Sequence, residues 1–230
     1  MKTIGLVGGT TPESTRVYYD LLIRGARKPG GDPLHNPKII IYSIDLAELV
    51  HIQRAGDRDQ VARYLADILE RLRTAGAEIG AFTANTPHAY LEDVQATTSL
   101  PLVSIVTATR EVAAERGLRR ALLLGTRTTV EAGMYPNELE RAGIDVVLPD
   151  EAEREFLDHT IYGDLAVGRI NPEVRHRYRA ICTRYIDSHD IDSVILGCTE
   201  LPLVISGDDL PIEVLDTTVI HAAAILQAAA

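Results

Sequence analysis

Short runs of apolar, often β-branched residues alternate along the chain with segments of helical periodicity. Between two of these runs, apolar side chains fall at helical spacing on one face, at Val61, Tyr64, Leu65, Ile68, Leu69 and Leu72. Continuous apolar strands separated by helices are typical of a parallel sheet covered on both faces. The pattern therefore predicts an α/β fold, with strands over 3–9, 38–44, 77–84, 100–106, 120–126, 144–149, 191–197 and 211–216.

Three helix starts carry their own signals. Thr11, Thr86 and Asn171 each precede a proline, so a side chain suited to capping is followed by a residue suited to the first helical position. The first two come close after predicted strands. Such a junction leaves backbone N–H groups at the carboxyl edge of the sheet, where α/β proteins commonly bind ligands. Candidate site residues are therefore expected at this edge.

The two halves of the chain contain similar short segments. GLVGGTT, which includes Gly8, resembles LLLGTRTT, which includes Gly125, at an offset of 117. FTANT, which includes Thr83, resembles LGCTE, which includes Cys198, at an offset of 115. The nearly equal offsets favour a duplicated α/β unit, with chance similarity as the alternative. In a duplicated unit, Thr83 and Cys198 are expected at equivalent positions.

Length and charge limit the class of protein. A chain of 230 residues with 46% hydrophobic residues can form one large α/β domain or two small ones. The formal net charge of −10 argues against a nucleic-acid surface, because no basic cluster is present to displace counterions. No apolar run is long enough to span a membrane, and the first residues lack a signal-peptide pattern. A cytoplasmic protein is expected, without nucleic-acid or membrane partners.

The two cysteines lie in different contexts. Two cysteines are too few for a disulfide framework, and no Cys/His cluster has zinc-ligand spacing, so no metal is expected. Cys198 follows an apolar strand and precedes Thr199 and Glu200; there, helix N-terminal amides can lower a thiol pKa from about 8.5 towards neutrality. This favours a base or nucleophile over a structural cysteine. Cys182 is predicted to be inert core, on one face with Val174, Tyr178, Ile181 and Tyr185.

Two other features allow several interpretations. GGTTPES, around Thr11, lacks the glycine spacing and the lysine of nucleotide loops, so it predicts either a small anion site at a helix N-terminus or a tight turn. A thiol acting in acyl transfer needs an orienting histidine. His88 and His221 are candidates, although nothing in the sequence brings either to Cys198, and His88 is expected at a helix start.

With these residues assembled, the chain resembles the cofactor-independent aspartate/glutamate racemase superfamily. The resemblance runs nearly end to end, through MKTIGLVGGTTPEST, AGAEIGAFTANTPH, LLLGTRTT, VILGCTELPL and VLDTTVIHA. It implies two pseudo-symmetric α/β domains with parallel sheets and the active site between them. The first domain is expected over 1–104 plus 212–230 and the second over 105–211. The resemblance also implies a homodimer.

The resemblance also implies a mechanism. In the superfamily, a pair of cysteines flanks the substrate α-carbon; one thiolate removes the α-proton and the other thiol protonates the opposite face, without pyridoxal phosphate or metal. Here Thr83 replaces the first cysteine. An aliphatic hydroxyl has no comparable anionic population near neutral pH. We therefore expect Cys198 to abstract the proton and the substrate to be reprotonated from the Thr83 side, directly or through a water.

Substrate-binding residues follow from motif position within the same resemblance. The side chains expected to contact the amino acid are Thr10, Gln53, Asn85, Thr86, Thr126, Thr199 and Glu200, the last accepting from the ammonium group. Aspartate-specific members carry an arginine and a lysine for the side-chain carboxylate. Arg54 is a possible counterpart of the arginine, while Ala166 stands at the lysine position, so that Arg127 or Arg169 is a possible substitute.

Three functions remain open. The first is a pyridoxal-phosphate-independent racemase for aspartate or glutamate, acting through Cys198 with no cofactor. The second is a one-cysteine decarboxylase of malonates, since that reaction needs a single proton donor. The third is a homologue without catalytic activity that binds an amino acid or a partner protein.

Overall fold

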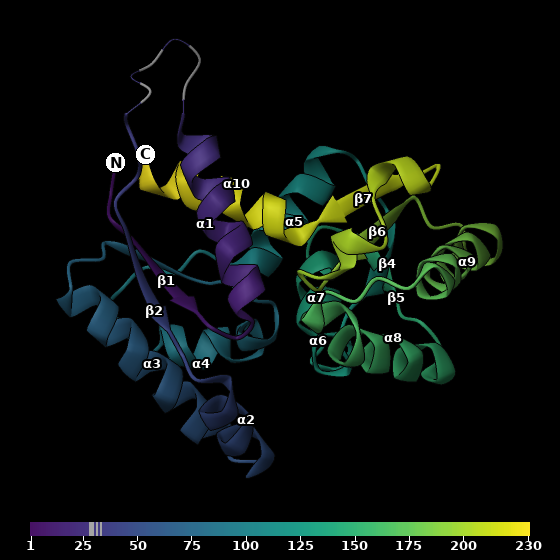
Figure 1. Ribbon diagram of the computed structural model, residues 1–230. Helices are drawn as coiled ribbons and strands as arrows, with labels where there is room; N and C mark the ends of the chain where they lie inside the picture. The colour runs from purple at the N-terminus through teal and green to yellow at the C-terminus, as the bar shows by residue number, and fades with distance from the viewer. Residues whose placement is uncertain (28–29, 31, 33) are drawn as a thin grey trace. The chain divides into compact units, whose positions relative to one another are not determined.

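The chain folds as two compact units. The computed structural model describes residues 1–27, 30, 32 and 34–230 (Figure 1). One unit comprises 1–105 and 221–230, and the other comprises 106–220. Each contains a parallel sheet with helices, which confirms the predicted α/β class. The segment 212–220 was expected in the first domain but lies in the second unit, because its strand pairs with that unit's sheet.

The first unit is built around a central strand. Its elements are β1 (Ile4–Gly8), α1 (Pro12–Ala26), β2 (Ile39–Ser43), α2 (Leu46–Arg54), α3 (Arg58–Thr74), β3 (Ile79–Phe82), the 3₁₀ helix η1 (Thr86–Tyr90), α4 (Leu91–Gln95), the first residue of α5 (Ile105–Glu115), and α10 (Thr217–Ala229) from His221 onward. The strands are parallel in the order β2-β1-β3.

Alternation along β1 directs its side chains to two helical layers. Ile4 and Leu6 pack against α1 and α10, whereas Val7 packs against α3. Figure 1 shows α1 and α10 on one side of the sheet and α3 on the other. Helix α3 buries Val61, Leu65, Ile68, Leu69 and Leu72, and Tyr64 packs partly buried against the same core, so the predicted apolar face is confirmed. The sheet is covered on both sides, so its carboxyl edge is where loops can present polar groups.

The second unit repeats this plan with one more strand. Its elements are β4 (Arg120–Leu124), α6 (Arg127–Glu131), α7 (Met134–Glu140), β5 (Asp145–Val147), α8 (Glu151–Gly163), η2 (Leu165–Val167), α9 (Pro172–His189), β6 (Ser193–Leu196), η3 (Leu201–Leu203), η4 (Gly207–Asp209) and β7 (Glu213–Asp216), besides the rest of α5 and the start of α10. The parallel strands run in the order β5-β4-β6-β7. Leu122 and Leu124 pack against α8 and α9, and the predicted core residue Cys182 lies in that cluster.

The predicted strand over 100–106 is wrong. Only a single bridge forms there, between Leu102 and Gly80, and α5 begins at Ile105. Pro101 has no N–H group and cannot donate to a sheet, which explains why an apolar, β-branched run gives no strand. The run instead pairs in parallel with β3 at Gly80 alone and then leads into α5.

Two of the three predicted helix caps are confirmed. The Thr11 side chain accepts from Ser14 N–H at the start of α1, and Asn171 accepts from Glu173 N–H at the start of α9. The third is wrong, because Thr86 is itself the first residue of η1 and no side-chain cap bond is formed at that end. The turn after β3 is therefore a short 3₁₀ helix rather than a capped α-helix.

Candidate active site

The second unit brings two loops together at the carboxyl ends of β4 and β6. Thr126 caps α6, accepting from Thr129 N–H at 3.3 Å and donating to its hydroxyl at 3.1 Å. Gly197 N–H donates to Leu124 O at 2.7 Å, and a Cβ on Gly197 would lie 2.8 Å from that oxygen. Glycine is thus required immediately before Cys198, because the two backbones approach closely there.

Cys198 is paired with a carboxylate. Its Sγ donates to Glu200 Oε2 at 2.9 Å, and Thr199 Oγ1 donates to the same oxygen at 2.8 Å. Burial, followed by the charge of Glu200 and this hydrogen bond, raises the pKa of the Cys198 thiol well above its ordinary value. Backbone N–H groups of Thr199 and Glu200 act in the opposite direction but are the smaller effects. The expected lowering of the thiol pKa is therefore wrong for this geometry.

Two tyrosines border the thiol. Burial raises the pKa of Tyr162 on α8 and of Tyr178 on α9, and the neighbouring charges of Cys198 and Asp158 act in the same direction. A side-chain hydrogen bond with Thr126 opposes the shift of Tyr162. Tyr162 thus links Thr126 to the surroundings of Cys198. Tyr162 was not among the residues predicted from the sequence, although it lies in the last turn of α8, only four residues before Ala166 at the lysine position.

In the first unit, Thr83 follows β3 directly. Its backbone N–H donates to Val7 O at 3.0 Å, and its hydroxyl donates to the same oxygen at 3.3 Å and lies 3.2 Å from Thr15 Oγ1. The residue is fully buried, and the Ser14 hydroxyl donates to its carbonyl oxygen. The Thr83 side chain thus fastens the end of β3 to β1 and α1.

The ladders of the two sheets give a residue-by-residue match between the units. Beside the central strand, the last paired residues are Val7 with Phe82 in the first unit and Leu124 with Leu196 in the second. The match of Val7 to Leu124 has the same offset as the predicted match of Gly8 to Gly125. Sequence and structure therefore agree on the central strands.

The match one strand along differs from the predicted one. Thr83 and Gly197 each donate the next backbone N–H to the central strand, so they are equivalent. Cys198 then corresponds to Ala84, one residue beyond Thr83. The predicted equivalence of Thr83 and Cys198 is corrected by one position, because short motifs without a gap penalty do not fix a register and a one-residue slip reverses side-chain direction.

The remaining candidates in the first unit lie on three loops or helix ends. Asn85 is buried in the turn before η1, and Thr86 is partly buried as its first residue. Thr10 lies partly buried in the loop after β1, and Gln53 is partly buried in the last turn of α2. None of the hydrogen bonds described within this unit joins the side chain of Thr10 or Gln53 to Thr83.

His88 is hydrogen-bonded to the backbone of the loop after β3. Its Nε2 accepts from Ile105 N–H at 3.2 Å, so the proton lies on Nδ1, which donates to Ala84 O at 2.9 Å. Burial lowers the pKa of His88 to about 4, so the ring is neutral at pH 7. His88 is thus part of a helix start, as expected, and it holds the backbone at the residue that corresponds to Cys198.

His221 is fixed in the same way. A carbonyl can only accept, so Nε2 carries the proton and donates to Val103 O at 2.9 Å, while Nδ1 accepts from the Tyr18 hydroxyl at 2.9 Å. Burial, with the neighbouring His88 ring second, lowers the pKa of His221 to about 3. Both ring nitrogens of both histidines are used within the first unit, which leaves neither available to orient a thiol.

The arginines considered for substrate binding are mostly paired. Arg127 forms ion pairs with glutamates of α6 and α8, and Arg169 pairs with Asp164. Arg54 is exposed at the end of α2. Ala166, at the lysine position, lies in η2. The cation for an acidic side chain is therefore not assigned by these contacts.

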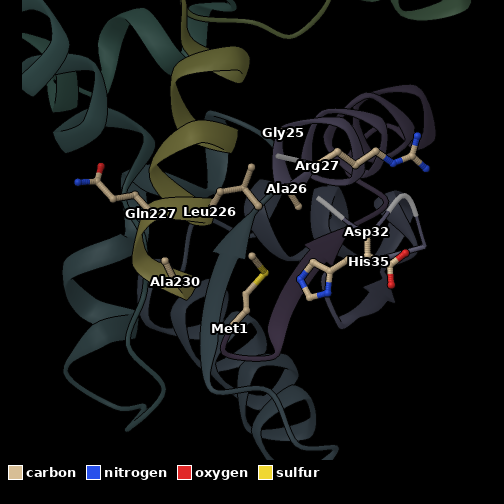
Figure 2. Close-up of a pocket in the computed structure, with 9 residues that line it drawn as sticks. All are labelled: Met1, Gly25, Ala26, Arg27, Asp32, His35, Leu226, Gln227 and Ala230. Atoms are coloured by element: carbon tan, nitrogen blue, oxygen red, sulfur yellow. The ribbon is translucent and has the colours of Figure 1, made fainter. Parts of the chain in front are cut away.

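A cavity of about 510 Å³ lies elsewhere in the first unit. It contains none of the candidate residues and is lined by Met1, Gly25, Ala26, Arg27, Asp32, His35, Leu226, Gln227 and Ala230 (Figure 2). Across the described part of the chain, no group of three or more His, Cys, Asp or Glu residues could hold a metal ion. Within the same residues, no helix is both long and apolar enough to cross a membrane.

Comparisons with known proteins agree with the fold. Residues 7–225 match the family model described as Asp/Glu/Hydantoin racemase. The broad specificity amino-acid racemase RacX of Bacillus subtilis (strain 168) is 26% identical over 219 residues, covering 94% of this chain and 92% of RacX. A candidate Asp/Glu racemase from Yersinia pestis superposes with a TM-score of 0.92 at 37% identity, covering 100% of this chain and 99% of that one. An aspartate racemase homologue from Pyrococcus horikoshii OT3 gives 0.87 at 40% identity, with the same coverage.

Proposed function

The chain belongs to the Asp/Glu/Hydantoin racemase family, and from this premise we propose that it racemises an acidic amino acid without pyridoxal phosphate. Cys198 removes the α-proton of aspartate or glutamate, and a second proton is delivered to the opposite face from the side of the segment that follows β3. The observation that carries the proposal is the Cys198 thiol at the carboxyl end of β6, hydrogen-bonded to Glu200 and close to two backbone N–H groups.

Proton transfer on the side opposite Cys198 differs from proton transfer at the thiol. The Thr83 hydroxyl is already hydrogen-bonded to Val7 O and lies close to the Thr15 hydroxyl within the first unit. This favours delivery of the proton through a water at the 83–86 segment over direct donation by Thr83. Water is a weak base, so abstraction on that face is slow unless a protein group assists. The reaction therefore relies on one thiol, with Ala84 at the position corresponding to it.

The substrate is held by polar groups of the strand-end loops. Backbone amides and the side chains of these loops stabilise the α-carboxylate and the carbanion-like transition state through preoriented donors. The proposed contacts are Thr10, Gln53, Asn85, Thr86, Thr126 and Thr199. Glu200 was expected to bind the ammonium group, but its Oε2 already accepts from Cys198 and Thr199, which favours a role through the thiol.

The substrate class rests on the family and its relatives. One structural relative is an aspartate racemase homologue, whereas RacX is a broad specificity racemase. With Arg127 and Arg169 in ion pairs, an acidic side chain has Arg54 as the remaining proposed partner. Aspartate and glutamate are therefore the first substrates to test, within a wider panel.

Proton NMR in deuterium oxide tests the proposal. L- and D-aspartate and L- and D-glutamate are each incubated with the protein, and the α-proton signal is followed. Loss of the signal with formation of the other enantiomer supports an acidic amino-acid racemase. Persistence of all four signals contradicts it. Carbon dioxide release from substituted malonates, or a ligand-induced rise in melting temperature without turnover, would then favour the one-cysteine decarboxylase or the binding homologue.

A further inference from the structure

The buried Cys198–Glu200 pair carries an inference that rests on the proposed function and adds a residue to it. Glu200 Oε2 accepts the thiol proton at 2.9 Å, and the Thr199 hydroxyl, at 2.8 Å from the same oxygen, orients the carboxylate towards the sulfur. Glu200 is only 6% exposed. A thiol in this setting must lose its proton before it can act as a base, and bulk water is largely excluded from the group next to it.

We propose that Glu200 takes the thiol proton of Cys198 and so creates the thiolate that attacks the substrate α-proton. The S–H bond breaks as an O–H bond forms, giving a thiolate beside a neutral carboxylic acid. The thiolate then takes the α-proton and becomes a thiol again, while the substrate becomes a carbanion. A solvent proton adds to the opposite face, and Glu200 releases its proton to solvent, which returns the pair to its starting state.

Charge favours this route over loss of the thiol proton to water. Direct ionisation would place a second negative charge beside the Glu200 carboxylate, in a buried setting that already raises the thiol pKa. Transfer within the pair keeps its total charge at minus one, so no additional charge is buried. The carboxylic acid formed can donate its new O–H back to the sulfur, and the backbone N–H groups of Thr199 and Glu200 stabilise the thiolate.

The other groups that face the thiol do not supply a better acceptor. Tyr162 on α8 and Tyr178 on α9 interact electrostatically with Cys198, and Asp158, also on α8, interacts with both tyrosines. The tyrosine hydroxyls have raised pKa values, so they are protonated near neutral pH and cannot accept a proton while remaining neutral. Asp158 accepts from Arg127 N–H at 2.8 Å at the start of α6. Both histidines are already bonded within the first unit.

The pH dependence of Cys198 alkylation by iodoacetamide tests the pair without any substrate. In the wild type, the rate should rise in two steps with a neutral plateau, because the two groups share one proton between their two macroscopic pKa values. In Glu200→Gln, the amide cannot take a proton, so a single alkaline step is expected. The same single step in both proteins overturns the proposal. A Cys198→Ala sample identifies alkylation at Cys182.

Racemisation gives a second readout with a different failure. At pH 7, α-proton exchange should fall on the order of a hundredfold in Glu200→Gln and recover towards the wild-type rate as the pH rises. Glu200→Asp should retain the two-step profile, and Glu140→Gln, an exposed control at the end of α7, should match the wild type. An unchanged profile in Glu200→Gln contradicts the proposal. Two-step alkylation without exchange on any substrate would sink the racemase function and leave the pair standing.

Discussion

The two units share a plan but not their chemistry. Each has its first strand at the centre of a parallel sheet, flanked by its second strand on one side and its third on the other. Each turns from the central strand into a helix capped by a threonine, Thr11 in the first unit and Thr126 in the second. Equivalent positions can therefore be compared directly, and the differences between them show where each half has specialised.

The largest difference stands just past the third strand. The first unit has Thr83 and Ala84 where the second has Gly197 and Cys198. Thr83 is a packing residue with a buried, hydrogen-bonded hydroxyl, and Ala84 has no group that moves a proton. One half therefore offers a thiol and the other offers backbone, which makes the proposed racemase a one-thiol enzyme.

The buried titratable groups differ in the same sense. The first unit holds His88 and His221, both neutral and both fully used in hydrogen bonds. The second holds Cys198 against Glu200, a pair that can exchange a proton. Fixed neutral imidazoles position backbone, whereas a thiol next to a carboxylate can react. The first unit therefore uses its buried histidines to position backbone, whereas the second contains the pair that is proposed to transfer a proton.

Removal of the Cys198 thiol should have the largest effect, because it takes away the main chemical difference between the two units. Cys198→Ala should lower α-proton exchange by at least about a thousandfold, because Cys198 is the group proposed to take the substrate α-proton directly. The matched control is Cys182→Ala, the same substitution at a core position of α9. It should lower the melting temperature and leave the exchange rate of the folded protein unchanged. NMR in deuterium oxide measures both. Exchange that survives in Cys198→Ala contradicts the assignment.

Acid should weaken the first unit through its histidines. Their pKa values are lowered from 6.5 to about 4 for His88 and about 3 for His221, so the unfolded chain binds more protons between those values. The contribution of the two neutral histidines to the free energy of unfolding is therefore fully present above pH 6.5. It decreases as the pH falls, by up to about 3 kcal/mol per histidine at pH 4. Urea unfolding between pH 7 and 4 measures this slope.

Carboxylates also titrate in that range, so a matched pair of variants separates the effects. His221→Gln keeps a donor for Val103 O and removes the proton-binding site, and the slope should decrease. His176→Gln, an exposed change on α9, should keep the wild-type slope. If His221→Gln leaves the slope unchanged, His221 is not responsible for the acid sensitivity.

A second thiol at the matched position should make the halves more alike. Ala84→Cys places a sulfur in register with Cys198, and kcat/KM for racemisation should rise on the order of tenfold. The rise must be equal in both directions, because the equilibrium constant between enantiomers is one. Thr83→Cys, one residue earlier, should give no rise, since that side chain is buried against Val7 and Thr15. A gain at residue 83 and none at 84 would restore the original sequence alignment.

The smallest effect is expected at Thr83 itself. Thr83→Val removes a buried hydroxyl and leaves its partners unsatisfied, which should cost about 1–2 kcal/mol in the free energy of unfolding. Exchange should change less than about twofold, since a water is proposed to carry the proton. Thr128→Val, at an exposed position on α6, serves as the control for stability. A hundredfold loss of exchange would mean that the Thr83 hydroxyl donates directly.

Much of the fold was predictable because periodicity and caps are local. The helix over α3, the caps at Thr11 and Asn171 and the core position of Cys182 follow from patterns within a few residues. The strand over 100–106 failed for a local reason too, since Pro101 cannot donate to a sheet.

The site was less predictable because it depends on contacts between distant residues. The register that matches Ala84 to Cys198 comes from two sheet ladders, not from either motif alone. The direction of the thiol pKa depends on Glu200 folding back onto the sulfur, and Tyr162 reaches the site from a helix more than thirty residues away. Sequence patterns gave the residues at the strand ends, and only packing decides which of them meet.

The stereochemical course of exchange tests the one-thiol account most directly. Each enantiomer of the accepted amino acid is incubated separately in deuterium oxide, and deuterium in recovered substrate is compared with deuterium in the inverted product at early times. With a single thiol, this ratio is expected to differ severalfold between the two enantiomers in the wild type and to become similar in Ala84→Cys. Equal ratios in the wild type would show two equivalent proton-transfer groups and would contradict the account.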